Sequence, residues 1–299
     1  MAAIRNVAVA GASGNLGSHV LKALLQANFN VTVLTRSQKP GSYDAKITVA
    51  EVDFTSTNSL TSALQNQDAV VSTVGIAGLE GQKILIDAAI AAGVQRFIPS
   101  DFGVCTTSPK VLGFPFYSTL ATVRQYLADK AATSTLSYTV VAPGSFLEYL
   151  LMAPSVVDFK NHSVALIDDG NNRFSTTTLA NVGTAIAGIF NNPEKTRNRV
   201  VYVSEAILTQ RQVLDIAKEI KSKITWTISN IKSSDVLREG LDAVASGDNS
   251  LQAVGKILLG TAFGGEEYGS AYDSNDNILV GIEAISQQKL KDLIAERFN

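Results

Sequence analysis

The first half of the chain alternates between short apolar runs and longer segments whose apolar residues recur at helical spacing. The short runs are rich in Val, Ile and Ala, as buried parallel strands are. The predicted strands are Asn6–Ala10, Asn30–Leu34, Ile47–Val52, Ala69–Val74, Arg96–Pro99 and Tyr138–Ala142. The predicted helices are Leu16–Gln26, Asn58–Leu64, Leu79–Ala92 and Tyr117–Ala132. Strands and helices in this alternation predict an α/β fold with a doubly wound parallel sheet.

The pattern becomes less regular after Pro143, although further elements are still visible. Strands are predicted at Val164–Ile167 and Arg199–Val203, and helices at Asn181–Phe190 and Gln212–Lys221. The segment Gly247–Gly269 is rich in glycine and is predicted to be loop-prone. A chain of 299 residues is long enough for about two domains. We expect a first domain over residues 1–150 and a smaller α/β domain over 151–299. No linker separates them, so the second is interleaved with the sheet and the boundary is soft.

Composition narrows the class of partner. Hydrophobic residues make up 45% of the chain, charged residues 17%, and the net charge is −2. No run of Lys or Arg supplies a basic face for nucleic acid. No apolar stretch reaches the roughly 18 residues that a membrane span needs, and the N-terminus lacks the layout of a signal peptide. The single cysteine, Cys105, forbids an intramolecular disulfide, and His19 and His162 are far apart, so no metal site is predicted. These features favour a soluble cytoplasmic protein.

The strongest motif is Gly11-Ala12-Ser13-Gly14-Asn15-Leu16-Gly17, which follows a predicted strand and opens a predicted helix. In this context Gly11 permits a tight turn, Gly14 lets the backbone approach a pyrophosphate, and Gly17 lets helix and strand pack closely. Unpaired N–H groups at the start of a helix attract anionic phosphates. The motif predicts a Rossmann-type dinucleotide site, rather than a glycine-rich turn without a ligand. The cofactor contacts are expected from Gly11, Ser13, Gly14, Asn15, Leu16 and Gly17.

The residues after the second strand bear on which dinucleotide binds. Chains that bind NAD place Asp or Glu there, on the ribose hydroxyls. This chain instead has Arg36 and Lys39 and no acidic residue at that point. A guanidinium pairs bidentately with a 2′-phosphate, whereas a carboxylate repels one. The sequence therefore favours NADP(H) over NAD(H).

Ligands of open α/β sheets bind beyond the carboxyl ends of the strands, so the residues that follow each strand are candidates for the same crevice. Asp53 and Phe54 follow the third strand and are expected beside the adenine. The other expected cofactor contacts, which follow the fourth, fifth and sixth strands, are Thr73, Val74, Gly75, Ser100 and Phe146.

Three segments resemble the isoflavone reductase-like or NmrA-like family of atypical short-chain dehydrogenases. They are the turn Gly11–Gly17, the string Arg96-Phe97-Ile98-Pro99-Ser100-Asp101-Phe102-Gly103, and Asp169-Gly170-Asn171 leading to Ser175–Thr178. The resemblance implies an NADP(H)-binding Rossmann domain, a small C-terminal substrate domain, and reduction of aromatic or polyketide-like small molecules. It also implies cofactor roles for Gly11, Gly14, Gly17 and Arg36, and a place near the nicotinamide for Phe146.

One position departs from the family pattern. Enzymes that this chain resembles carry a lysine, the proposed proton-transfer group, in a pattern like F-x-x-K-x-x-[IV]-R. The aligned run here is Tyr117-Ser118-Thr119-Leu120-Ala121-Thr122-Val123-Arg124, which places Leu120 at the lysine position. A leucine donates no proton. The Tyr-x-x-x-Lys pair of other short-chain dehydrogenases is also absent, because Tyr117 is followed by Ala121 at that spacing.

Two side chains are candidates to replace the lysine as proton donor. The hydroxyl of Tyr117 is an acid if neighbouring charge lowers its pKa, and otherwise Tyr117 is a packed aromatic residue. Lys110, in a preceding loop, is an acid if it is desolvated over the site, and otherwise it is an exposed lysine.

An apolar, aromatic pocket is expected beside the nicotinamide, which suits a flat hydrophobic substrate. Its expected residues are Phe102, Leu120, Leu147, Tyr149, Leu150, Phe263 and Tyr268. The leading hypothesis is an NADPH-dependent reductase of a small aromatic or unsaturated metabolite, acting as a monomer or homodimer. Because Leu120 removes the usual donor, two alternatives stay open. One is a non-redox cyclase, isomerase or dehydratase that holds NADP(H), and the other is an NADP(H)-sensing regulator.

Overall fold

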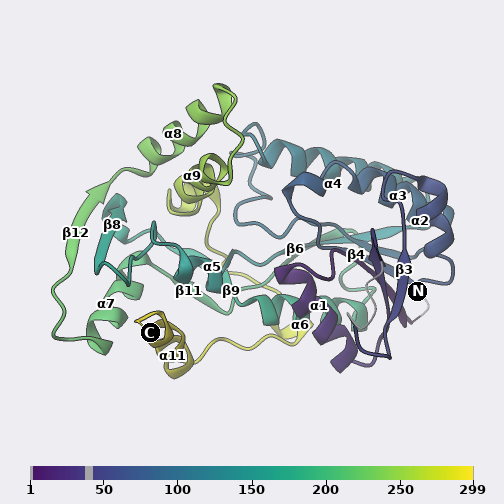
Figure 1. Cartoon of the computed structure of the whole chain (residues 1–299), viewed down its shortest axis with the longest axis horizontal. Helices are drawn as coiled ribbons and strands as arrows, with labels where there is room; N and C mark the ends of the chain where they lie inside the picture. The colour runs from purple at the N-terminus through teal and green to yellow at the C-terminus, as the bar shows by residue number, and fades with distance from the viewer. Residues whose placement is uncertain (1–2, 38–42, 299) are drawn as a thin grey trace.

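A computed structural model describes residues 3–37 and 43–298 of the chain. Its centre is a seven-stranded parallel sheet in the order β10-β6-β5-β4-β1-β2-β3 (Figure 1). The strands are β1 (Asn6–Ala10), β2 (Asn30–Thr35), β3 (Thr48–Glu51), β4 (Ala69–Ser72), β5 (Arg96–Ile98), β6 (Ser137–Ala142) and β10 (Arg199–Tyr202). The predicted α/β class with a parallel sheet is confirmed.

Helices cover both faces of this sheet. One face carries α1 (Asn15–Gln26) and α6 (Leu179–Asn191), and the other carries α2 (Thr57–Ala63), α3 (Gln82–Ala91) and α4 (Tyr117–Ala132). Side chains alternate along each strand, so Val7 and Val9 of β1 pack toward α1 and α6, while Ala8 and Ala10 pack toward the other helices. This two-sided burial explains why β1 is apolar at consecutive positions from Val7 to Ala10.

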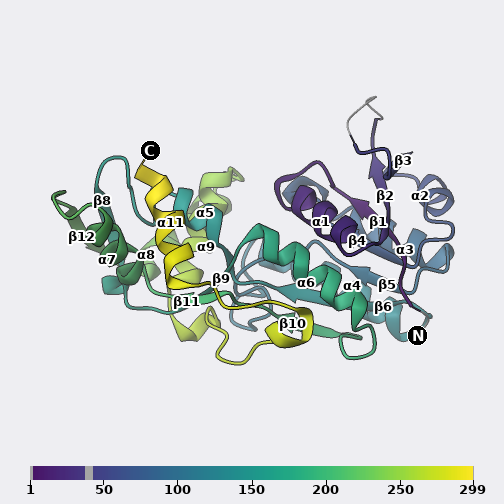
Figure 2. The same cartoon turned by 90° about the horizontal axis from the view of Figure 1, so that it is seen from below.

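The remaining chain forms a smaller lobe beyond the carboxyl ends of the strands (Figure 2). It has a three-stranded sheet, β11-β9-β7, and a two-stranded sheet, β12-β8. The strands are β7 (Ser145–Phe146), β8 (Ser163–Ile167), β9 (Phe174–Thr177), β11 (Ala206–Leu208) and β12 (Thr227–Ile231). Its helices are α5 (Leu147–Met152), α7 (Gln210–Ile220), α8 (Ser233–Ala245), α9 (Leu251–Ala262) and α11 (Gln287–Ala295). The short helix α10 (Asn277–Val280) instead packs against α6 of the large lobe. Short 3₁₀ turns lie at Asp168–Gly170, Glu266–Tyr268 and Glu296–Phe298, and another, Ile76–Gly78, follows β4 of the large sheet.

The smaller lobe has its own apolar core, but the chain does not divide cleanly at residue 150. Strand β10 returns to the edge of the large sheet beside β6, and α6 returns to pack against α1. Removing everything after residue 150 would therefore strip one edge strand and one covering helix from the first lobe.

The expectation that Gly247–Gly269 is loop-prone is wrong, because most of this segment is helix α9. The helix begins at a cap in which the Ser250 side chain accepts a hydrogen bond from the Ala253 N–H. Gly260 of α9 and Gly240 of α8 allow the two helices to pack closely. A Cβ on Gly260 would lie 2.7 Å from the Cβ of Leu237, and a Cβ on Gly240 would lie 2.8 Å from the backbone nitrogen of Ile257. Glycine at these positions marks a helix–helix contact rather than a loop.

Candidate active site

The turn between β1 and α1 has the geometry that the glycine motif predicts. Gly11 has a φ of +82°, in the left-handed region that favours glycine. A Cβ on Gly17 would lie 2.1 Å from the Gly11 carbonyl oxygen, so only glycine lets the helix begin this close to the turn. No side chain caps α1 and no acidic residue stands in its first turn. Its leading N–H groups and the positive end of its dipole are therefore suited to an anion.

A cavity of about 870 Å³ opens beside this turn, and we call it the arginine cavity. It runs along the carboxyl ends of β1, β2 and β4. Arg36 is exposed and is the only charged side chain among its described lining residues. The lining residues are Gly11, Ala12, Ser13, Leu34, Thr35, Arg36, Tyr43, Phe54, Thr55, Ser72, Val74, Gly75, Ile76, Ala77, Gly78, Gly81, Gln82, Ile84, Leu85 and Leu251. Lys39, the second expected cation, lies outside the described residues.

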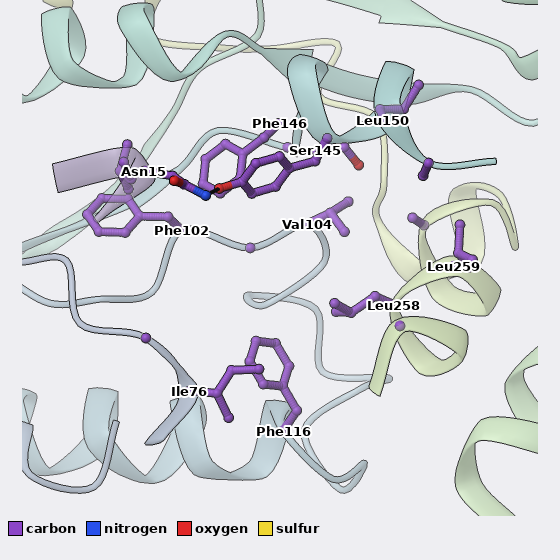
Figure 3. Close-up of a pocket in the computed structure, with 18 of the residues that line it drawn as sticks. Asn15, Ile76, Phe102, Val104, Phe116, Ser145, Phe146, Leu150, Leu258 and Leu259 are labelled. Carbon is purple, nitrogen blue, oxygen red and sulfur yellow. Dashed lines mark hydrogen bonds between the residues drawn. The ribbon is translucent and has the colours of Figure 1, made fainter. Parts of the chain in front are cut away.

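A second cavity, of about 670 Å³, continues from the first, and we call it the apolar cavity (Figure 3). The two cavities share Val74, Gly75 and Ile76, directly after β4. The lining residues are Gly14, Asn15, Leu16, Thr73, Val74, Gly75, Ile76, Leu79, Ser100, Phe102, Gly103, Val104, Phe116, Leu120, Gly144, Ser145, Phe146, Tyr149, Leu150, Ala153, Ser155, Val156, Gly255, Leu258, Leu259, Ala262 and Phe263. None of these carries a formal charge, and Tyr149 is the one titratable side chain among them.

Hydrogen bonds tie the strand-end loops into one floor for these cavities. The Ser100 hydroxyl donates to the Val74 carbonyl at 2.7 Å, and the Thr73 hydroxyl donates to the Ala10 carbonyl at 2.9 Å. The Ser100 N–H donates to the Gln82 side-chain oxygen at 2.7 Å. The loops after β1, β4 and β5 are therefore held together, and the hydroxyl protons of Ser100 and Thr73 are both committed to backbone carbonyls.

The string Arg96–Gly103 owes its distinctive residues to structure. Arg96 is fully buried and donates to the hydroxyls of Ser137 and Thr139 at 2.9 and 2.8 Å, and burial lowers its pKa to about 10. Asp101 is 2% exposed and pairs with Arg124 of α4 at 2.6 Å, while burial raises the pKa of its carboxyl group. These contacts fix the loop that carries Ser100 and Phe102 into the apolar cavity.

Most of the expected cofactor residues meet at the two cavities. Gly11, Ser13, Arg36, Phe54, Val74 and Gly75 line the arginine cavity, and Gly14, Asn15, Leu16, Thr73, Ser100 and Phe146 line the apolar one. Gly17 lines neither and contributes by packing. Asp53 also lies outside both. Its carboxylate accepts hydrogen bonds from the hydroxyl and the N–H of Thr55 at 2.6 and 2.8 Å, which lower its pKa and shape the loop. The expected place of Asp53 beside the adenine stays a prediction.

Neither expected proton donor reaches the apolar cavity. Tyr117 is fully buried and its hydroxyl is 2.7 Å from that of Thr261 in α9. Burial also raises the pKa of this phenol, which is the opposite of what an acid at neutral pH needs. Lys110 is exposed and forms a surface ion pair with Glu267 at 3.4 Å. The roles expected of Tyr117 and Lys110 are therefore not supported.

The expected substrate residues divide in the same way. Phe102, Leu120, Tyr149, Leu150 and Phe263 line the apolar cavity. Leu147 points into the core of the smaller lobe, fully buried, and Tyr268 packs at the edge of that core. Leu120 itself is 3% exposed, so the position of the family lysine is occupied by a packed apolar side chain.

Sequence reasoning missed the wall that α9 contributes. Leu258 and Leu259 face the apolar cavity across from Asn15 and Phe146 (Figure 3), and Leu251 at the start of α9 lines the arginine cavity. The apolar spacing of Leu251, Val254, Leu258 and Ala262 was the available signal, and the surrounding glycines obscured it.

The described residues contain neither a membrane-spanning helix nor a metal-binding cluster. Within residues 3–37 and 43–298, no helix combines the length and the apolar character needed to cross a bilayer. The same ranges contain no group of three His, Cys, Asp or Glu side chains placed to hold a metal ion.

Comparison with known proteins agrees with this geometry. The oxidoreductase aprR of Aspergillus flavus is 33% identical over 246 residues, covering 81% of this chain and 82% of aprR. The isoflavone reductase of Pisum sativum is 27% identical over 234 residues, covering 68% of this chain and 71% of the pea protein. The structure of AtPrR2 with NADP⁺ and (+)pinoresinol has the same fold, with a TM-score of 0.78 at 21% identity over 100% of both chains. The model of the NmrA-like family matches residues 4–239, which confirms the resemblance seen in the sequence, and the chain belongs to that family.

Proposed function

We propose that this protein is an NADPH-dependent reductase whose substrate is an uncharged, flat, mainly aromatic small molecule. The observation that carries the proposal is the junction of the two cavities at Val74, Gly75 and Ile76. One cavity combines a phosphate-binding turn with an arginine, and the other is a chamber without charge. This arrangement supports a dinucleotide bound with its reactive end next to an apolar substrate.

The residues present fit NADP(H). The first turn of α1 and the arginine cavity offer backbone N–H groups and one guanidinium, with no carboxylate among the described lining residues. Two buried polar atoms at the same cavity, the Ser72 hydroxyl and the Gln82 side-chain amide nitrogen, have no hydrogen-bond partner. A dinucleotide with ribose and amide groups supplies such partners. AtPrR2, which shares the fold, binds NADP⁺.

Arg36 is the residue that selects NADPH over NADH in this proposal. It stands just beyond β2, where a 2′-phosphate is expected, and it is exposed within the cavity, so it is free to form a bidentate pair. When bound, the reduced nicotinamide supplies the hydride. The chain's own residues hold the cofactor against the β4 and β5 loops and exclude water with Phe102, Phe146 and α9.

The apolar cavity determines the class of substrate. Its aromatic walls come from Phe102, Phe116, Phe146 and Phe263, and its volume lies in the usual range for drug-sized ligands, roughly 300–1,000 Å³. A charged substrate would lose its hydration without gaining a partner, which costs several kcal/mol. The pea relative is an isoflavone reductase and AtPrR2 holds pinoresinol, so relatives of this chain also handle neutral aromatic compounds.

The test is a turnover assay that follows nicotinamide absorbance. Uncharged aryl enones, quinones and aryl imines should oxidise NADPH, and matched compounds with an added carboxylate should react at least about 10-fold more slowly. NADPH binding without turnover of any uncharged aromatic acceptor would contradict the reductase and favour a regulator. Conversion of substrate with no change in nicotinamide absorbance would instead indicate non-redox chemistry.

A further inference from the structure

Reduction of a polarised double bond needs a proton as well as a hydride, and the packed Leu120 cannot provide it. The apolar cavity holds few groups that can. Ser100 and Thr73 donate their hydroxyl protons to backbone carbonyls, and the remaining lining hydroxyls, Ser145 and Ser155, are aliphatic alcohols, which are very weak acids. Tyr149 is the only phenol among the lining residues.

We propose that Tyr149 is the proton donor of the reaction and that Asn15 is its positioning residue. This inference rests on the proposed function. Tyr149 lies on α5, one turn beyond Phe146, and Asn15 is the first residue of α1 in the cofactor-binding turn. The side-chain amide of Asn15 donates a hydrogen bond to the phenol oxygen of Tyr149 at 2.7 Å.

The direction of this hydrogen bond matters for the chemistry. Because the phenol oxygen accepts from Asn15, the phenol's own proton is left free to point toward a substrate. The same amide remains to stabilise the negative charge that develops on the oxygen when the proton leaves. The Phe146 ring, 5.6 Å from the Tyr149 ring at 87°, holds the phenol in an edge-to-face contact beside the expected nicotinamide position.

The position of Tyr149 also allows the proton to be replaced. Tyr149 is 42% exposed, so its ring reaches from the apolar cavity to the cavity mouth. In contrast, Tyr117 is fully buried with its hydroxyl bonded to Thr261, and Lys110 is a surface residue that does not line the cavity. Among the described residues that line the apolar cavity, Tyr149 alone combines a phenol proton with access to water.

The step balances as follows for an enone. The substrate gains the hydride and its electron pair at the β-carbon as the nicotinamide is oxidised. The resulting enolate takes the proton of the Tyr149 hydroxyl at the α-carbon, which breaks the O–H bond and forms a C–H bond. The phenolate, whose charge the Asn15 amide has stabilised in the meantime, then takes up one proton from bulk solvent, so each turnover consumes one solvent proton.

Tyr149 lies on α5, on the side of the cavity that carries Phe146. Figure 3 shows Asn15 and Phe146 on one side of the cavity and Phe116, at the start of α4, on the other. The family lysine position, Leu120, belongs to α4. The donor therefore acts from a different wall, which explains how the site can lose the lysine without losing a proton source.

The test compares wild type with Tyr149→Phe and Asn15→Ala at saturating NADPH on two acceptors, an uncharged aryl enone and 1,4-naphthoquinone. Hydride transfer to the quinone yields a hydroquinone anion, which needs no enzymatic acid. Tyr149→Phe should lower kcat for the enone by about 100-fold or more and leave the quinone within about 3-fold. Asn15→Ala should lower the ratio of the enone rate to the quinone rate by about 10-fold. The ratio is the readout because Asn15 also belongs to the cofactor-binding turn, where its loss can slow both reactions together. Tyr138→Phe, a partly buried tyrosine on β6 outside both cavities, is the control that should leave both rates unchanged.

Fluorescence titration with NADPH and far-UV circular dichroism show that each variant is folded and binds cofactor. If Tyr149→Phe does not fold, the Asn15→Ala result decides the question by its selective loss of the enone rate. Wild-type enone turnover that survives in both variants overturns Tyr149 as the donor and leaves the reductase intact. Wild type that reduces only the quinone also overturns it, because no proton transfer is then required. Wild type that reduces neither acceptor contradicts the proposed function itself.

Discussion

Replacing Gly17 by alanine tests the packing that brings the start of α1 to the cofactor. The new Cβ would lie 2.1 Å from the Gly11 carbonyl oxygen, so turn and helix have to separate by about 1 Å. Overpacking of this kind costs about 1–3 kcal/mol, and the better helix propensity of alanine returns at most about 1 kcal/mol. We therefore expect a net loss of about 1–2 kcal/mol in the free energy of unfolding.

The larger effect should fall on cofactor affinity. Hydrogen bonds from N–H groups to a phosphate are worth about 1.5–3 kcal/mol each, and a displacement of about 1 Å removes at least one of them. NADPH affinity should fall by about 10- to 100-fold. Urea unfolding followed by circular dichroism measures the first effect, and fluorescence titration with NADPH measures the second.

Gly113→Ala is the matched control for this experiment. Gly113 has no heavy atom within 4 Å of an added Cβ and lines neither cavity, so both measurements should match wild type. A Gly17→Ala protein with wild-type urea midpoint and wild-type NADPH affinity would refute the packing argument.

Three further substitutions separate structural from functional residues. Tyr117→Phe should keep kcat within about 2-fold of wild type and cost about 1 kcal/mol of stability, since only the contact with Thr261 is lost; a loss of activity with intact folding would restore Tyr117 as an acid. Arg124→Met leaves the Asp101 carboxylate buried without its partner and should destabilise the protein by about 3–5 kcal/mol in urea unfolding. Because burial already raises the Asp101 pKa in the folded state, the loss of stability should be small near the ordinary carboxyl pKa of about 4 and should grow as the pH rises above it. A loss that does not change with pH would show that the buried charge of Asp101 is not its cause. Arg36→Ala should weaken NADPH binding by about 10- to 100-fold while NADH binding changes by less than about 2-fold, and equal losses for both cofactors would remove Arg36 from the 2′-phosphate site.

Local patterns sufficed for the large sheet and for the phosphate-binding turn. Strands buried on both faces are rich in apolar residues, and the segments Asn6–Ala10 and Asn30–Leu34 are both strands of the parallel sheet. The glycine spacing of the turn is likewise a local property, because Gly11 and Gly17, which contact each other, are close together in the sequence. The position of Arg36 in the cofactor cavity could also be predicted, because Arg36 is the residue directly after β2.

Contacts between distant residues could not be predicted in this way. Tyr117 and Thr261 are 144 positions apart, so nothing near Tyr117 in the sequence indicates that its hydroxyl is already engaged. Asn15 and Tyr149 are 134 positions apart and meet only because the chain after β6 folds back over the start of α1. The α8–α9 packing was hidden for a different reason, because glycine both breaks helices in isolation and permits close contact between them.

The most direct test of the central claim is a parallel titration of the wild-type protein with NADPH and with NADH at one ionic strength. NADPH should bind about 10- to 100-fold more tightly than NADH, because Arg36 gains a phosphate partner that NADH lacks. Equal affinities, or no affinity for either dinucleotide, would contradict it.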